Sequence, residues 1–260
     1  MTVVPAEWAP HRAIWVGWPS HPDLWQEDLA PARAEVTTLV KALANPGEEQ
    51  VRLLCSGPEA AAAARKAMIG VEGVTVDEGL FGDIWLRDTG PIFTSLGHAQ
   101  AFRFNGWGGK YQLPGDETVA EQIARHSGAE LHRHGFILEG GALDHDGEGT
   151  VLTTRQCLLN PNRNPGWTEA DAEAALASAL GVKKVLWLDD GLKNDHTDGH
   201  VDNLARFVAP GEVVCPIAWG QKDQNAAAYD ACAKALSGMT DAAGRKLTVH
   251  RIPSPGLVQD

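Results

Sequence analysis

Three stretches of the chain share one order of hydrophobic pattern, namely strand, strand, helix, strand. They begin near Ile84, Phe136 and Val201, and the segment from about Arg12 to Cys55 fits the order loosely. A repeat of roughly 50 to 60 residues is typical of arrays of small blades around an axis. An ordinary doubly wound sheet remains the alternative, because hydrophobic pattern alone does not exclude it. Both alternatives predict the α/β fold class.

The predicted elements are bounded by turn residues such as Asn45-Pro46-Gly47. Helices are expected over residues 28–44, 58–68, 117–126, 169–180 and 225–236. Strands are expected at 51–55, 74–76, 92–93, 101–104, 130–132, 136–138, 150–153, 184–188, 201–208, 212–216 and 246–252. Three hairpins are expected, with turns at 96–98, 146–147 and 210–211.

The composition limits the class of protein. With 43% hydrophobic residues, 260 residues can bury a sizeable core, and no linker or low-complexity tract divides them, so we expect one domain over residues 1–260. A net charge of −12 argues against nucleic acid as a partner. No secretory leader pattern and no apolar run of about 20 residues is present, so a cytoplasmic protein without a membrane partner is expected. The four cysteines are scattered, which favours reduced thiols.

Chemically active side chains gather where the repeats begin. Asp88, Glu139 and the pair His200 and Asp202 each stand near the start of a predicted unit. If a strand begins at His200, its side chain and that of Asp202 point to the same side. Equivalent positions converge on the centre of a circular array, so the four could line one pocket. Two carboxylates there would suit a guanidinium, which binds carboxylates through paired hydrogen bonds.

Other interpretations of these residues stay open. Asp88 could pair with Arg87 or cap a turn, Glu139 could be a turn residue, and His200 could be a satisfied structural histidine. A metal site is a further alternative, because the segment 195–202 offers carboxylates and imidazoles, although it lacks the helical His spacing of a zincin.

The chain resembles the agmatine deiminases, of the guanidine-modifying (pentein) superfamily, which are grouped with the peptidylarginine deiminases of the Porphyromonas type. The matching stretches follow one another along nearly the whole chain. They are residues 5–11, Trp15-Val16-Gly17-Trp18-Pro19, 83–91, Phe104-Asn105-Gly106-Trp107-Gly108-Gly109-Lys110-Tyr111, Leu138-Glu139-Gly140-Gly141, 157–164 and Asp198-Gly199-His200-Val201-Asp202-Asn203.

The resemblance implies a five-bladed propeller of ββαβ units, with the active site on its axis. It implies hydrolysis of agmatine to N-carbamoylputrescine and ammonia, with no metal and no organic cofactor. Asp88 and Asp202 would hold the guanidinium, His200 would be the general acid and base, and Glu139 would orient His200. Trp85 would wall the pocket, and the loop of Trp107, Gly108 and Lys110 would lie near its mouth.

The sequence departs from this family in one respect. The family mechanism uses a cysteine nucleophile that follows a Gly-rich motif close to the C-terminus, and that motif is not present among these residues. None of Cys55, Cys157, Cys215 and Cys232 is a natural substitute, and Cys157 is expected to be structural.

We therefore expect a C-terminally truncated domain with about four of the five blades and little or no deiminase activity. An open array leaves strand edges uncovered, so marginal stability or a partner, including a homo-oligomer, is expected. Peptidylarginine deiminase-like activity and a non-catalytic guanidinium-binding or interaction protein remain the alternatives.

Overall fold

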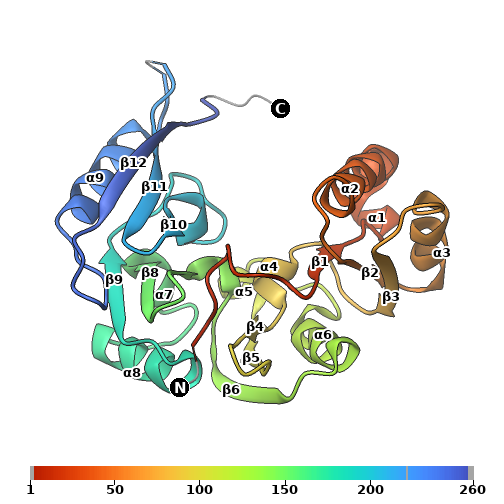
Figure 1. Cartoon of the computed structure of the whole chain (residues 1–260), viewed down its shortest axis with the longest axis horizontal. Coiled ribbons are helices and arrows are strands. Elements are labelled where there is room, and N and C mark those ends of the chain that lie inside the picture. The colour runs from red at the N-terminus through yellow and green to blue at the C-terminus, as the bar shows by residue number, and fades with distance from the viewer. Residues whose placement is uncertain (1–2, 221, 257–260) are drawn as a thin grey trace.

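The computed structural model describes residues 3–220 and 222–256, so Met1, Thr2, Gln221 and the stretch 257–260 lie outside the described residues. These residues form four sheets of three strands each, with helices packed on them. In Figure 1 the sheets follow one another in chain order along an arc, from β1–β3 at the right to β10–β12 at the upper left. The expected α/β class is confirmed.

The first sheet is wholly parallel and so differs from the other three. Its strands are β1 (Ile14–Gly17), β2 (Val51–Ser56) and β3 (Val74–Gly79), connected through α1 (Pro22–Trp25), η1 (Gln26–Asp28), α2 (Leu29–Ala44) and α3 (Pro58–Ala67). A helix lies in each connection, and a helical crossover brings the chain back to pair in parallel. The loose fit of this segment to the repeat has this topological cause.

The other three units have the predicted ββαβ order. Their first two strands form hairpins: β4 (Ile92–Phe93) with β5 (Ala99–Arg103), β7 (Asp144–His145) with β8 (Thr150–Thr154), and β10 (Arg206–Ala209) with β11 (Glu212–Ile217). The third strands run parallel to the second: β6 (Leu131–Ile137), β9 (Lys184–Leu188) and β12 (Thr248–Pro253). The crossover helices are α6 (Val119–Ser127), α8 (Glu169–Leu180) and α9 (Ala226–Ser237).

Two of the predicted hairpin strands are placed wrongly. Residues 136–138 do not open a hairpin, because Phe136 and Ile137 are the end of β6, and the hairpin partner of β8 is Asp144–His145. The strands predicted at 130–132 and 136–138 are parts of one strand, because β6 continues through Gly135 beside a register shift against β5, where a glycine is readily accommodated. Likewise Val201–Asn203 is a 3-10 turn (η4), and the strand begins only at Arg206.

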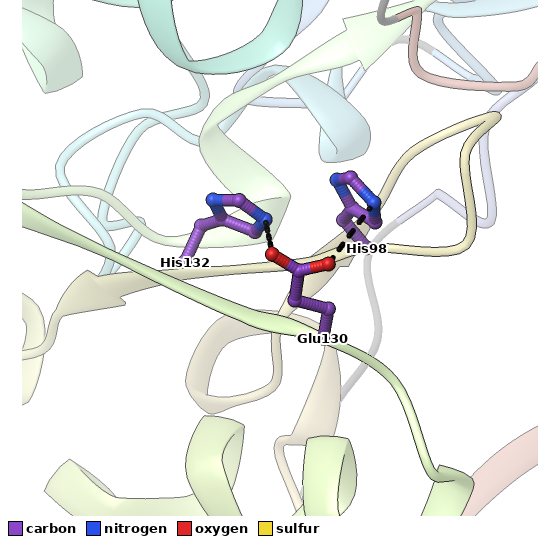
Figure 2. A group of neighbouring side chains, drawn as sticks. All are labelled: His98, Glu130 and His132. Carbon is purple, nitrogen blue, oxygen red and sulfur yellow. Dashed lines mark ion pairs between the residues drawn. The ribbon is translucent and has the colours of Figure 1, made fainter.

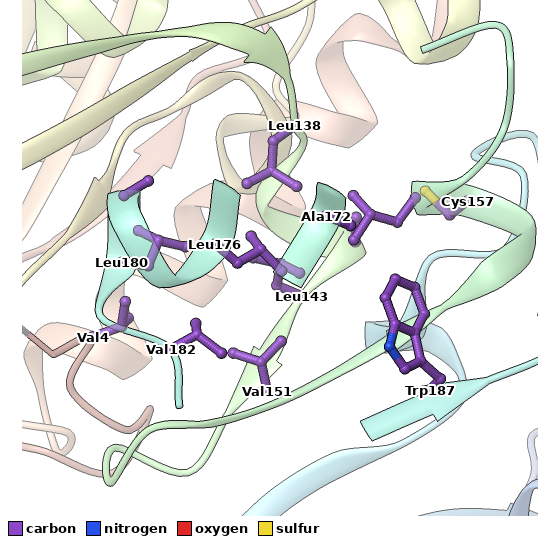
Figure 3. Packing of buried hydrophobic residues seen from close by; sticks show 13 residues of the cluster. Val4, Leu138, Leu143, Val151, Cys157, Ala172, Leu176, Leu180, Val182 and Trp187 are labelled. Atoms are coloured by element: carbon purple, nitrogen blue, oxygen red, sulfur yellow. The ribbon is translucent and has the colours of Figure 1, made fainter. Parts of the chain in front are cut away.

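Helix α8 shows how local signals fix an element. Thr168 caps its N-terminus in a capping box with Asp171, and Gly181 ends it in the left-handed conformation at φ 71°. Its buried face, which includes Leu176, packs on the sheet of β7–β9. Figure 3 shows this packing, with Leu176 and Leu180 facing Val151 and Val182. The predicted bounds of this helix match the structure.

Buried polar side chains join neighbouring sheets. Asp116, in the turn η2 (Asp116–Thr118), accepts a hydrogen bond from the Gly82 backbone N–H at 2.7 Å. Asn164 bonds both backbone groups of Ile137, at 3.0 and 2.8 Å. Asp144 accepts from Arg206 Nε at 2.7 Å across the gap between the third and fourth sheets. Each sheet is thereby joined to the next by hydrogen bonds of a buried polar residue.

The connecting segments that lead into the last three sheets lie next to one another. They are the short helical turns α4 (Leu86–Thr89), η3 (Gly140–Ala142) and η4, each directly before the first strand of its unit. Turn α4 contacts η3, and η3 contacts η4. Two further short turns, α5 (Gly106–Gly109) and α7 (Arg155–Leu158), border this region. Within the described residues, no helix has the length and apolar character to cross a bilayer.

Candidate active site

Gly141 marks the point where the predicted site residues converge. A methyl group placed on its Cα would lie 2.5 Å from His200 Nδ1, 2.7 Å from Asp88 Oδ1 and 2.8 Å from Asp202 Oδ2. The three side chains come from two different turns, α4 and the 200–203 region, and meet above the backbone of a third. Only a residue without Cβ leaves room for them.

Asp88 is held in place through both carboxylate oxygens. Oδ1 accepts from the Gly141 backbone N–H at 3.0 Å, and Oδ2 accepts from Trp107 Nε1 at 2.9 Å. Burial is the largest influence and raises the pKa of Asp88 above the usual aspartate range, although these two donors oppose it. Arg87 pairs with Glu7 at 2.8 Å, so the simpler interpretation of an Asp88–Arg87 pair is wrong.

Asp202 contributes a second carboxylate, which has fewer hydrogen-bond donors among the described residues than Asp88 has. Burial raises its pKa, and the nearby charge of Asp88 adds to the rise while His200 opposes it. Among the described residues, no lysine or arginine forms an ion pair with Asp202, and Asp88 has only the His200 ring, at 3.6 Å between Nδ1 and Oδ1. The two carboxylates therefore form a negative site without a side-chain cation.

His200 is buried, with a side chain 2% exposed. Its backbone N–H donates to Thr197 Oγ1 at 3.0 Å, while Asp195 accepts from the N–H and hydroxyl of Thr197 and so shapes the approach to the turn. Burial lowers the pKa of His200, and the charges of Glu139 and Asp202 act in the opposite direction. Its Nε2 is shielded from solvent and has no hydrogen-bond partner in the described part of the chain.

Glu139 is fully buried and is paired with Arg163. Arg163 Nε donates to both Glu139 oxygens, at 3.0 and 2.9 Å, and Nη1 donates to Asp198 at 2.9 Å. Glu139 therefore acts on His200 through its charge rather than through a direct hydrogen bond. The pattern of the sequence did not single out Arg163 as a site residue, although it lies in the matched stretch 157–164.

The loop of α5 borders the site on one side. Trp107 has a left-handed backbone at φ 53° and a buried ring, which directs its indole N–H to Asp88. A Cβ on Gly108 would lie 2.2 Å from Asn162 Nδ2, so this position requires glycine. Lys110 does not extend freely, because its ammonium donates to the His196 carbonyl at 2.9 Å and pairs with the Asp198 carboxylate.

Trp85 is exposed to solvent, whereas Cys157 is buried. Trp85 is 54% exposed, with its indole N–H donating to Asp83 at 2.8 Å. Cys157 is buried beside the centre, where its Sγ and one atom each of Glu139 and His200 lie within 4.8 Å of one another. Burial raises the pKa of the Cys157 thiol. Sequence reasoning treated this thiol as structural and did not place it beside His200.

The metal alternative finds little support in the arrangement of the 195–202 segment. The carboxylate of Asp198 is engaged by Lys110, Asn162 and Arg163. In the described ranges two groups of three side chains could hold a metal ion, and of the 195–202 residues only His200 belongs to either.

Comparison with known proteins identifies the family of the chain. The sequence model of the family "Porphyromonas-type peptidyl-arginine deiminase" matches residues 3–260. The agmatine deiminase of Ectopseudomonas mendocina is 40% identical over 98% of this chain and 71% of its own length, and that of Stutzerimonas stutzeri is 42% identical over 97% and 70%.

Solved structures give the same result. The agmatine deiminase of Enterococcus faecalis superimposes with a TM-score of 0.88 and 35% identity, covering 98% of this chain and 71% of that one. The C. jejuni agmatine deiminase with substrate bound gives 0.86 and 28%, over 100% and 77%. The chain thus spans about 70% of the length of its curated relatives. It belongs to the agmatine deiminases of the Porphyromonas-type peptidyl-arginine deiminase family, a family of hydrolases.

Proposed function

We propose that the chain binds the guanidinium group of agmatine between Asp88 and Asp202. The observation that carries the proposal is their convergence over Gly141, at 2.7 and 2.8 Å from the same point, with no lysine or arginine paired to either among the described residues. A planar guanidinium presents donors along two edges, and each carboxylate can accept from one of them. Trp85, Trp107, Gly108 and Lys110 border the path of the alkyl chain in this proposal.

His200 is the proton carrier of the proposed reaction. Because burial lowers its pKa, the imidazole is neutral near pH 7 and can take up a proton. The charges of Glu139 and Asp202 then stabilise the imidazolium that forms. In the complete reaction a thiol gives its proton to His200 as its sulfur attacks the guanidinium carbon, ammonia leaves, and water releases N-carbamoylputrescine and the thiol. His200 protonates the departing nitrogen and then activates the water.

The attacking thiolate is not supplied by the four cysteines of these 260 residues. All four are buried, and burial raises the pKa of the Cys55 thiol to about 12. The pKa of Cys215 is lowered to about 7 by a hydrogen bond with Cys232, but both lie in the core between β11 and α9. We therefore propose that these residues bind agmatine with little or no hydrolysis.

The finer description of the fold is also a proposal. The four sheets correspond to four blades of a five-bladed pentein propeller, with α4, η3 and η4 on its axis. The ββαβ order of three units supports this description, as do the solved deiminases that this chain matches over 71 to 78% of their lengths.

Calorimetric titration of the purified 260-residue chain tests the binding proposal. Agmatine is expected to bind, whereas putrescine, which has the same alkyl chain without the guanidinium, is expected to bind at least tenfold more weakly. Asp202→Asn should abolish the preference, and Asp230→Asn, a surface carboxylate paired with Arg251, should leave it unchanged. Equal affinity for agmatine and putrescine would refute the proposed site.

Two further measurements separate the alternatives. A panel of agmatine, arginine and a peptide arginine distinguishes agmatine recognition from the peptidylarginine type, and we expect agmatine to bind most tightly. Ammonia release from agmatine by the purified chain is expected to stay at background. Release that is abolished by Cys157→Ser would contradict the proposed absence of a nucleophile.

A further inference from the structure

A second cluster of ligand-type side chains lies in the second sheet. His98 directly precedes β5, Glu130 directly precedes β6, and His132 is the second residue of β6. Ala99 pairs with Leu131 and Gln100 with His132, so the parallel register places the three side chains on one face of the sheet. The Ala99 backbone N–H donates to the Glu130 carbonyl at 2.8 Å and fixes this end of the ladder.

The donor atoms of this cluster are directed toward one another. Figure 2 shows the Glu130 carboxylate between the two imidazole rings. His98 Nε2 lies 3.6 Å from one carboxylate oxygen, and His132 Nε2 lies 3.3 Å from the other. The two rings stack with their centroids 4.7 Å apart. Although His132 Nε2 is shielded from solvent, it has no hydrogen-bond partner in the described part of the chain.

The two nitrogen–oxygen separations match those of a metal coordination shell. Zinc binds imidazole nitrogen and carboxylate oxygen at about 2.0 to 2.2 Å, which places tetrahedral ligands roughly 3.4 Å apart. The two observed nitrogen–oxygen separations lie on either side of that value, and all three donors fall within 4.8 Å of one another. Two imidazoles and one carboxylate suit zinc and other late first-row metals, and leave the fourth position to water.

We propose that His98, Glu130 and His132 bind one divalent zinc-type metal ion. The bound ion joins the turn before β5 to the start of β6, so it stabilises the second sheet. None of the three residues belongs to the proposed guanidinium site, and the proposal stands independently of agmatine binding. The buried group of Glu139, Cys157 and His200 differs in containing a sulfur donor, and this difference allows the two groups to be told apart by spectroscopy.

Zinc titration of the chelator-treated chain tests the proposal. We expect one Zn²⁺ per chain near neutral pH and a higher melting temperature with zinc, because the ion binds only the folded state. His132→Ala and the isosteric Glu130→Gln should each weaken binding by at least about tenfold, the smallest loss seen for partners even outside the first coordination shell. His250→Ala is the matched control, because His250 pairs with Glu212 at 2.9 Å without a third ligand.

Cobalt substitution identifies the donors. Co²⁺ at the proposed site is expected to give a visible spectrum without a sulfur-to-metal charge-transfer band. The proposal is overturned if zinc does not saturate, if Glu130→Gln and His132→Ala bind it as the unsubstituted chain does, or if the charge-transfer band places the metal on a cysteine.

Discussion

Substitution of Gly141 by alanine tests whether the three site residues converge, because it leaves the backbone of the chain unchanged. The backbone of Gly141 does not lie in the left-handed region, so alanine can adopt its conformation. Gly141 sits in the turn η3, where alanine has no propensity cost relative to glycine. The added methyl group acts only through the atoms it meets, which are His200 Nδ1, Asp88 Oδ1 and Asp202 Oδ2.

The size of the effect follows from those contacts. The nearest, His200 Nδ1, must retreat from 2.5 Å to an ordinary separation of 3.4 Å, and Asp202 Oδ2 must retreat from 2.8 Å. The carboxylates that hold the guanidinium are thus displaced by roughly 0.6 to 0.7 Å and the His200 ring by roughly 0.9 Å. A misplacement of about 1 Å costs about a hundredfold in a positioned site. Agmatine affinity should therefore fall about a hundredfold, equivalent to about 3 kcal/mol.

Calorimetric titration with agmatine measures this change, and thermal unfolding checks that the variant is folded. Gly135→Ala is the matched control, because Gly135 is exposed and nothing lies within 4 Å of the added Cβ. The control should bind agmatine as the unsubstituted chain does. If Gly141→Ala binds agmatine within twofold of the control, the three side chains do not converge on the ligand and the reasoning fails.

Three further predictions concern charge and packing. Agmatine affinity should fall as the pH is lowered, and the fall should begin at a higher pH than for ordinary aspartates, because burial raises the pKa values of Asp88 and Asp202. Titration at several pH values would show a flat profile if this is wrong. Arg163→Met should lower the unfolding free energy by about 3 to 5 kcal/mol, since it leaves the buried Glu139 charge unpaired; urea unfolding within 1 kcal/mol of the unsubstituted chain contradicts it. Leu176→Ala should cost about 2 to 5 kcal/mol in the same assay, because the side chain is fully buried, and a neutral result would place Leu176 outside the core.

Much of the fold could be predicted because most elements carry local signals. Helix α8 has a capping Thr168 and a terminating Gly181, and its bounds were predicted to the residue. Strand β6 was predicted as two separate strands, 130–132 and 136–138, and only its pairing with β5 shows that it continues through Gly135. Strand β1 was missed, because its four residues are too short for a clear periodic pattern.

The site could be predicted only in part. Position at the start of each unit was enough to select Asp88, Glu139, His200 and Asp202, and the structure places Asp88, His200 and Asp202 around one point. The reason offered for His200 and Asp202 was wrong, because they lie on a 3-10 turn and not on one side of a strand. Arg163 could not be found, since nothing local distinguishes a buried arginine that joins two distant carboxylates from one exposed to solvent.

The most direct test is a crystal structure of the 260-residue chain soaked with agmatine. We predict that the guanidinium lies between the carboxylates of Asp88 and Asp202, with His200 within hydrogen-bond reach of a guanidinium nitrogen. Agmatine bound elsewhere, with both carboxylates facing solvent or other side chains, would contradict the proposed site.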